Sequence, residues 1–243
     1  MTNLSSLEIE IARNLDSVNT RISKAAKSAG RKPEDILLVV VSKKQPVRVV
    51  RAAMNVGIRN FGENYPEQAV DKIAAFIHAP DIRWHMIGHL QSRKIRIVAQ
   101  KFHYMQSLDS LDLAEKLNDS LELEKKILPV LLQFNVGGEP NKHGWGASKE
   151  EHWEELLPEV AEILKLPFLD VRGLMTMPPL EIEIENARMH FRKLYRLKEF
   201  LQNNFPQKSW SSLSMGTSVD FEVAIQEGAT IIRVGQAILG TRV

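Results

Sequence analysis

The segment DILLVVVSKKQP places two adjacent lysines, Lys43 and Lys44, just after an uninterrupted apolar run at residues 36–41. A lysine past a strand end is most often a charge that faces solvent. Partial burial and the like charge of Lys44 would instead lower the pKa of the Lys43 amine from its usual value of about 10.4. A neutral amine of this kind can form a Schiff base with an aldehyde.

Two glycine-containing segments near the C-terminus, SMGTSVDF and RVGQA, have the composition of a phosphate site. Each has a turn glycine, Gly216 or Gly235, and we expect a helix to start near Ser218, where free backbone N–H groups would bind an anion. Arg233 adds a planar set of charged donors. Either segment alone is compatible with an ordinary turn and helix cap. A phosphate site beside Lys43 predicts pyridoxal phosphate as cofactor, and another phosphorylated metabolite bound without a covalent link is an alternative.

Eight short apolar or β-branched runs, each followed by a turn and a helical pattern, organise the chain. Hairpin signals are absent, which favours parallel strands joined by crossover helices. The simplest closure is a single (β/α)8 TIM barrel domain over residues 1–243, with an amphipathic N-terminal helix within residues 1–30 packed on it. A doubly wound open sheet is the alternative. The expected strands are residues 36–41, 58–61, 83–87, 103–107, 127–135, 169–175, 209–213 and 230–234, and the main helices between and after them are residues 46–55, 66–76, 92–101, 110–124, 149–164, 185–203 and 219–226.

Barrel closure would bring the candidate chemical groups to one place. Active sites of such barrels lie at the C-terminal ends of the strands, and phosphates are often held by the loops after the last two strands. Because the first strand would adjoin the eighth, Lys43 should point into the mouth beside the glycine loops. Glu63 and Asn64, after the second strand, either face the same mouth or cap the next helix.

Two histidines, His85 and His89, lie four residues apart in WHMIGHLQSRK. The flanking residues predict a strand, in which this spacing puts both side chains on one face but far apart. No carboxylate–histidine cluster accompanies them in the sequence, so we predict no metal site. We expect His85 to line the barrel interior and His89 to lie at its rim.

Composition and charge argue against several classes of protein. The formal net charge is +2, and basic residues are scattered among acidic ones, which gives little support to nucleic-acid or membrane binding. There is no cysteine, so disulfides and thiolate chemistry are excluded. The N-terminus does not have the pattern of a signal peptide, and no window is apolar enough to span a bilayer. We therefore expect a cytoplasmic protein.

Several segments together resemble the pyridoxal phosphate homeostasis protein family, formerly called the YggS family, whose members are similar to the barrel domain of alanine racemase standing alone. The resemblance runs from about residue 36 to residue 242 and is carried by VVVSKKQP, NFGENYPEQ, WHMIGHLQSRK, LMTMPP and LSMGTSVDFEVAIQEGATIIRVGQAILGTR. It implies a protein that holds pyridoxal phosphate, keeps the free cofactor low and exchanges it with client enzymes. No established catalytic activity goes with the family.

The resemblance also implies roles for individual residues. Lys43 would be the Schiff-base lysine, and Asn64 would lie near the cofactor. The phosphate region would be held by the segments that contain Met215, the backbone of Thr217, Ser218, Arg233 and Gly235. The family pattern has methionine where this chain has Thr217, which should matter little if that position acts through its backbone N–H.

A racemase-type enzyme of the same barrel class is the alternative function. Such an enzyme needs a second acid/base group, a tyrosine supplied by an additional β domain that we do not expect in this chain. Tyr104 falls inside a predicted strand and Tyr195 inside a helix, so Tyr65 alone lies near a strand end. We therefore predict a carrier without catalytic turnover. Because racemases dimerise with that extra domain, a monomer is expected.

Overall fold

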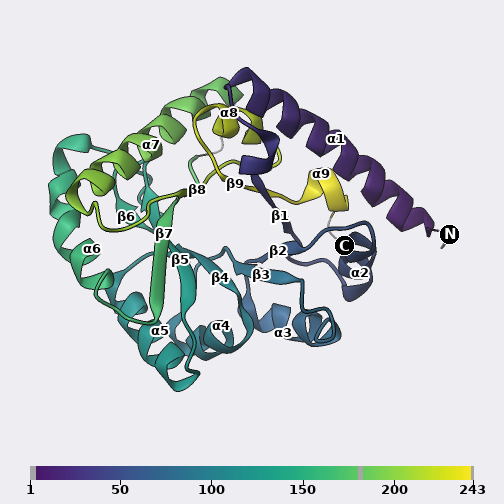
Figure 1. Cartoon of the computed structure of the whole chain (residues 1–243), viewed down its shortest axis with the longest axis horizontal. Helices are drawn as coiled ribbons and strands as arrows, with labels where there is room; N and C mark the ends of the chain where they lie inside the picture. Colours follow the sequence, from purple (N-terminus) through teal and green to yellow (C-terminus); the bar gives the residue numbers. More distant parts are fainter. Residues whose placement is uncertain (1–3, 180–182, 242–243) are drawn as a thin grey trace.

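Eight parallel strands close into a barrel in the computed structural model, which describes residues 4–179 and 183–241 (Figure 1). Neighbouring strands follow the chain order, and the pairing of the first barrel strand with the last closes the ring. The open-sheet alternative is therefore wrong. The barrel strands are β1 (Leu37–Val41), β2 (Asn60–Glu63), β3 (Arg83–Met86), β4 (Tyr104–Leu108), β5 (Leu128–Asn135), β7 (Leu169–Met175), β8 (Ser212–Ser214) and β9 (Ile231–Val234).

Helices surround the strands, as Figure 1 shows. They are α1 (Ser6–Ser28), α2 (Val47–Asn55), α3 (Pro66–Ala75), α4 (Ile95–Lys101), α5 (Leu111–Leu123), α6 (Leu157–Ile163), α7 (Ala187–Asn204), α8 (Phe221–Gln226) and α9 (Gln236–Leu239). Short 3-10 turns occupy Pro33–Asp35, Ser92–Lys94, Glu150–Leu156 and Ile184–Asn186, and the two-residue strand β6 (Trp145–Gly146) pairs with the end of β5 outside the barrel. In the described ranges no helix combines the length and the apolarity needed to cross a bilayer.

Side chains alternate between the two faces of each strand and so form two apolar regions, one outside and one inside the barrel. In β1, Val40 belongs to the main core between strands and helices, whereas Val39 belongs to a small cluster with Leu131, Met175 and Ile231. Successive residues of a strand point to opposite faces, so the small cluster fills part of the barrel interior. Burial on both faces explains why β1 is an unbroken apolar run.

Helix α1 is an addition to the barrel and packs against α2, α8 and α9. It begins with a capping box, in which the Ser5 hydroxyl accepts from the Glu8 N–H and the Glu8 carboxylate accepts from the Ser5 N–H. Ile11, Val18 and Ile22 form its buried stripe. The helix thus covers the outside of the last two β/α units.

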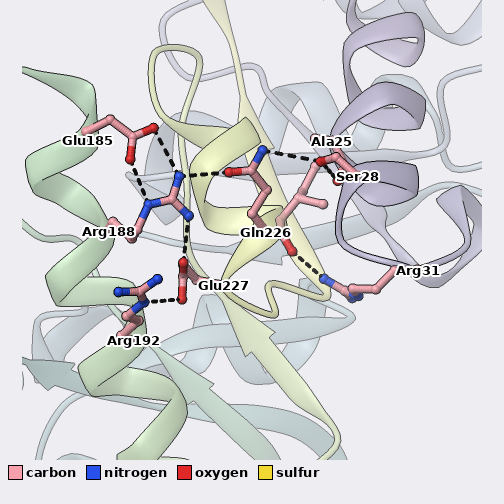
Figure 2. Close-up of polar contacts among 9 residues, drawn as sticks. Ala25, Ser28, Arg31, Glu185, Arg188, Arg192, Gln226 and Glu227 are labelled. Carbon is pink, nitrogen blue, oxygen red and sulfur yellow. Dashed lines mark hydrogen bonds and ion pairs between the residues drawn. The ribbon is translucent and has the colours of Figure 1, made fainter.

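A polar network connects α1, α7 and the end of α8 (Figure 2). Arg188 on α7 donates to Glu185, to Glu227 at 2.6 Å and to Gln226 at 2.8 Å. The Gln226 side chain in turn donates to Ser28 Oγ on α1 at 3.3 Å. These contacts hold the N-terminal helix and α7 to the short helix that follows the candidate phosphate loop.

The boundaries of several elements differ from the prediction. Strand β8 begins at Ser212 rather than at residue 209, and the helix expected over residues 149–164 is a 3-10 turn up to Leu156 and becomes α6 only at Leu157. Strand β2 begins at Asn60, two residues later than expected, so Glu63 is its last residue. The helix expected near Ser218 begins at Phe221 with Asp220 at its N-cap position, so the Ser218 start is wrong. The limits expected for the domain, residues 1 and 243, lie outside the described residues.

Candidate functional site

The ends of β1 and β9 lie side by side at the barrel mouth. Val40 of β1 pairs with Val234 of β9, so Lys43 and Gly235 follow closely on neighbouring strands. A Cβ atom at Gly235 would lie 3.2 Å from the carbonyl oxygen of Val41. Glycine thus allows the loop after β9 to approach the end of β1 closely, and the half-buried Lys43 is brought beside this loop.

Four hydrogen bonds hold Ser42, the residue before Lys43, and one of them runs from the Gln45 N–H to the Ser42 carbonyl at 3.0 Å. The serine N–H donates to the Gly62 carbonyl at 3.0 Å, its hydroxyl donates to Glu63 Oε1 at 2.7 Å, and its carbonyl also accepts from Lys72 Nζ at 2.8 Å. Lys72 and Glu63 also form a buried ion pair at 2.6 Å. Because the N–H, the hydroxyl and the carbonyl of Ser42 are all hydrogen-bonded, the backbone before Lys43 is held in one position.

The two lysines of the SKK segment have different surroundings. Lys43 is half-buried, whereas Lys44 is exposed and has a φ of +61°, in the left-handed region that few non-glycine residues adopt. The chain turns away from the mouth at this residue, and Gln45 is buried again. Only the first lysine is thus placed at the entrance of the barrel.

The loops after β8 and β9 form a corner rich in hydrogen-bond donors. Gly216 has a φ of +93°, and a Cβ atom there would lie 2.6 Å from Ala224 Cβ, so only glycine fits this turn. Ser218 Oγ accepts from the Gly235 N–H at 3.2 Å and connects the two loops. Within the described residues, the N–H groups of Gly216, Ser218 and Gln236 have no protein acceptor. Such a set of N–H groups suits an anion.

Thr217 and Met215 are already bonded within this corner. The Thr217 N–H donates to Asp220 Oδ1 at 2.6 Å, and its hydroxyl donates to the same oxygen at 2.9 Å. Met215 is fully buried, and its N–H donates to the Ile231 carbonyl. A ligand would therefore compete with Asp220 for the Thr217 N–H that the sequence suggested was free.

Arg233 lies inside the barrel, where it is 3% exposed. Its guanidinium donates to Ser214 Oγ and, at 2.9 Å, to the carbonyl of Thr176. Burial lowers its pKa to about 10, a shift that Asp220 partly opposes, so the side chain keeps its charge at neutral pH. The residue thus supplies a fixed positive charge from the interior, with two of its donors bonded to the barrel rather than to the phosphate corner.

A chain of hydrogen bonds continues from Arg233 across the interior. Ser214 donates to Gln106 Oε1 at 2.6 Å, and Gln106 Nε2 lies 3.1 Å from His85 Nδ1. His85 Nε2 lies 3.0 Å from Asn60 Oδ1. These partners require Nδ1 to accept and Nε2 to donate, which is the neutral form of the ring. Burial agrees, since it lowers the pKa of His85 to about 3.

Two buried acceptors at the end of β2 have no hydrogen-bond partner in the described structure: Glu63 Oε2 and Asn64 Oδ1. Gly88 permits the close packing of Asn64, because a Cβ atom there would lie 2.5 Å from the Asn64 carbonyl oxygen. Unsatisfied buried acceptors are rare in folded proteins and are typical of positions that a ligand completes. The donor-rich corner and the Asn64 acceptor therefore fit a bound molecule that carries both a phosphate and further polar groups, whereas Glu63 is turned toward Lys72 of α3.

Closure thus brings together the candidate residues Lys43, Gly216, Ser218 and Gly235, with Asn64 at the neighbouring end of β2. Sequence reasoning missed Lys72, which holds the backbone before Lys43. Its position carried a signal, since Lys72 lies on the same face of α3 as the buried Ala69. A lysine within an apolar stripe is expected to have a buried partner.

The chain is similar to one family of known proteins over nearly its whole length. The family model of the alanine racemase N-terminal domain matches residues 13–243. Relatives called pyridoxal phosphate homeostasis protein include that of Vibrio alginolyticus, 39% identical, and that of Escherichia coli K12, 40% identical; each alignment covers 96% of this chain and 97% of the relative.

Solved structures agree with these matches. PipY of Synechococcus elongatus PCC7942, solved with pyridoxal phosphate bound, superposes with a TM-score of 0.82 at 33% identity and covers 95% of this chain and 100% of its own. Alanine racemase of Clostridium difficile 630 has a TM-score of 0.68 at 15% identity, and the match covers 94% of this chain and 56% of the racemase. The latter likeness concerns the fold alone.

Lys72→Met should lower the free energy of unfolding by about 3–5 kcal/mol, because it leaves the Glu63 carboxylate buried without its partner. A double variant with Glu63→Gln should recover part of this loss. Lys116→Met, which removes an exposed ion pair with Asp112, should cost less than about 1 kcal/mol. Urea unfolding of the variants measures all of these values. A Lys72→Met loss no larger than that of Lys116→Met would show that the buried pair contributes little.

Stability should fall in acid partly through His85. In the unfolded chain His85 takes up a proton below a pH of about 6.5, whereas in the folded barrel its pKa is about 3. The free energy of unfolding therefore decreases as the pH falls through this window. His85→Gln should flatten the profile by up to about 1.4 kcal/mol per pH unit. Chemical unfolding of both proteins between pH 7 and pH 4 measures the difference. If the free energy of unfolding had the same pH dependence in both proteins, His85 would be protonated in the folded barrel.

Proposed function

This chain belongs to the pyridoxal phosphate homeostasis protein family and carries the alanine racemase N-terminal domain, and from this premise we propose that it binds pyridoxal phosphate and exchanges it with client enzymes. The observation that carries the proposal is the closeness of Lys43 to the donor-rich corner formed by the Gly216 and Gly235 loops. A lysine beside an anion site matches a ligand that has an aldehyde and a phosphate.

Each predicted residue has a proposed task in holding the cofactor. When bound, pyridoxal phosphate supplies an aldehyde that condenses with a primary amine, and Lys43 is the proposed amine. Ser218 and the free N–H groups of its loop would bind the phosphate, with Gly235 keeping that space open. Arg233 would add positive charge from the interior, and Asn64 would bind a polar group of the ring. Met215 and Thr217 would line the corner, the latter by sharing its N–H with Asp220.

Fixing the residue before Lys43 serves this task. Because Ser42 is held through its N–H, its hydroxyl and its carbonyl, the lysine starts from one backbone position and loses little further freedom when it reacts. The buried Lys72–Glu63 pair therefore acts as a positioning device for Lys43.

The positions of the tyrosines support a carrier over a racemase-type enzyme. Tyr104 is stacked on His85 inside the barrel, with ring centroids 5.3 Å apart, and Tyr195 lies on α7. Tyr65, which directly precedes α3 at the end of β2, is 42% exposed. An acid/base tyrosine must be held within hydrogen-bond reach of the substrate, a requirement that favours a fixed ring over an exposed one.

The proposal includes the setting in which the protein works. We propose a single-domain monomer in the cytoplasm, with pyridoxal phosphate and its client enzymes as partners and no nucleic-acid or membrane partner. The scattered charge and the absence of cysteine support this setting.

Added pyridoxal phosphate should give a visible Schiff-base absorption band, and borohydride should fix the cofactor to Lys43, as peptide mapping reads out. Lys43→Ala should abolish both signals. Lys44→Asn is the matched control, because asparagine tolerates the left-handed backbone, and it should retain both. Label spread over surface lysines, or equal loss in the two variants, would contradict Lys43 as the attachment point.

The loaded protein should show no amino-acid racemase or decarboxylase turnover above that of free pyridoxal phosphate. The reason is that Tyr65 alone among the three tyrosines lies near the C-terminal end of a barrel strand, and its side chain is exposed. Turnover can be measured by chiral chromatography of amino acids after incubation. Substantial turnover that disappears in Lys43→Ala would refute the carrier and favour the racemase-type enzyme.

A further inference from the structure

We propose that His89, Asp109 and His143 form a site for a divalent transition-metal ion at the barrel mouth. One ligand atom from each residue lies within 4.8 Å of the others. The sequence argued against a metal because no carboxylate–histidine cluster accompanies His85 and His89. Folding separates these two histidines and brings His89 to a carboxylate and another histidine from distant parts of the chain.

The distances are close to those of a metal centre. His89 Nδ1 and Asp109 Oδ2 share a hydrogen bond of 2.7 Å, which an ion would replace, and His143 Nδ1 lies 3.9 Å from the same oxygen. Ligand atoms about 2.0–2.1 Å from a tetrahedral zinc ion are roughly 3.3 Å from one another, so the two observed distances bracket the value required. The imidazole rings are stacked, with centroids 3.6 Å apart, so the two histidine side chains already lie side by side.

Three different strand ends supply the ligands. His89 follows β3, Asp109 follows β4, and His143 lies between β5 and β6. Because parallel strands end at the same rim of a barrel, these loops meet there even though their residues are far apart in the sequence.

The backbone on both sides of the cluster is held in place. Ser107 Oγ donates to the Gly88 carbonyl at 2.7 Å, next to His89, and Gln133 Nε2 donates to the His143 carbonyl at 2.9 Å. Gly144 has a φ of +108°, and a Cβ atom there would lie 2.6 Å from the Gln133 carbonyl oxygen. Loops held in this way limit the freedom that the ligands would lose on binding an ion.

The chemistry of the ligands selects the class of metal. Imidazole nitrogens suit zinc, copper, nickel and cobalt, whereas magnesium and calcium prefer oxygen ligands throughout. The Asp109 side chain is 7% exposed, while the side chains of His89 and His143 are 41% and 55% exposed. Two imidazoles and one carboxylate therefore leave coordination positions open to water or to an external ligand. A bound ion would also tie the loop between β5 and β6 to the ends of β3 and β4.

Equilibrium dialysis of the full chain tests this site, with any affinity tag removed and the protein stripped by chelator in the absence of pyridoxal phosphate. We expect one equivalent of zinc to bind and to raise Tm. His143→Ala and Asp109→Asn should each weaken binding by more than about tenfold. His78→Ala, which removes an exposed histidine elsewhere, is the matched control and should leave the affinity unchanged. Unchanged circular dichroism of each variant without metal establishes that it is folded.

Three results would overturn the site. They are the absence of saturable zinc binding to the folded protein, equal weakening by His78→Ala and His143→Ala, and displacement of zinc by an equal concentration of magnesium. A cobalt-loaded sample gives an independent readout, because inner-sphere imidazole ligands change its visible spectrum and His89→Ala should reverse that change. Since no step uses pyridoxal phosphate, failure here would leave the proposed function untouched, and failure of cofactor binding would leave the metal site untouched.

Discussion

The buried charge of Arg233 is the constraint on which the interior of this barrel depends. A guanidinium that is removed from water needs hydrogen-bond acceptors from the strands around it, since an unpaired buried charge costs several kcal/mol. Ser214 and the Thr176 carbonyl supply the first acceptors. Gln106 then accepts from Ser214 and donates to His85, which remains neutral. One cation is thereby linked through hydrogen bonds to polar residues on several strands, and burial keeps the histidine at the end of this chain neutral.

The same principle operates at the mouth, where Lys72 and Glu63 are buried together and hold Ser42 between them. A buried ion pair of this kind adds little stability over a hydrophobic pair of the same size, but it fixes geometry. Here the geometry concerns the residue before Lys43. The interior network and this pair thus fix the strand end that carries Lys43, and such preorganisation lowers the cost of binding a ligand there.

Sequence patterns were sufficient for the fold because the relevant information is local. Unbroken apolar runs such as that of β1 predict strands buried on both faces, and helical periods between them predict crossovers. The errors concern the boundaries of elements, as at the starts of β2 and α8. Ser218 resembles an N-cap as much as Asp220 does, and only the backbone of the folded chain shows that α8 begins at Phe221. Segment resemblance added the family, which the comparisons confirm.

By itself, then, the sequence determined the eight strands, the family and the candidate groups Lys43, Gly216 and Gly235, because each is visible in a short window of residues. The tertiary structure alone decided which groups meet. It paired Lys72 with Glu63, placed Arg233 inside the barrel, and assembled the cluster of histidines around Asp109. The physical reason is that closure of a parallel barrel brings strand ends from across the chain to one rim, and no local pattern records which side chains will face one another there.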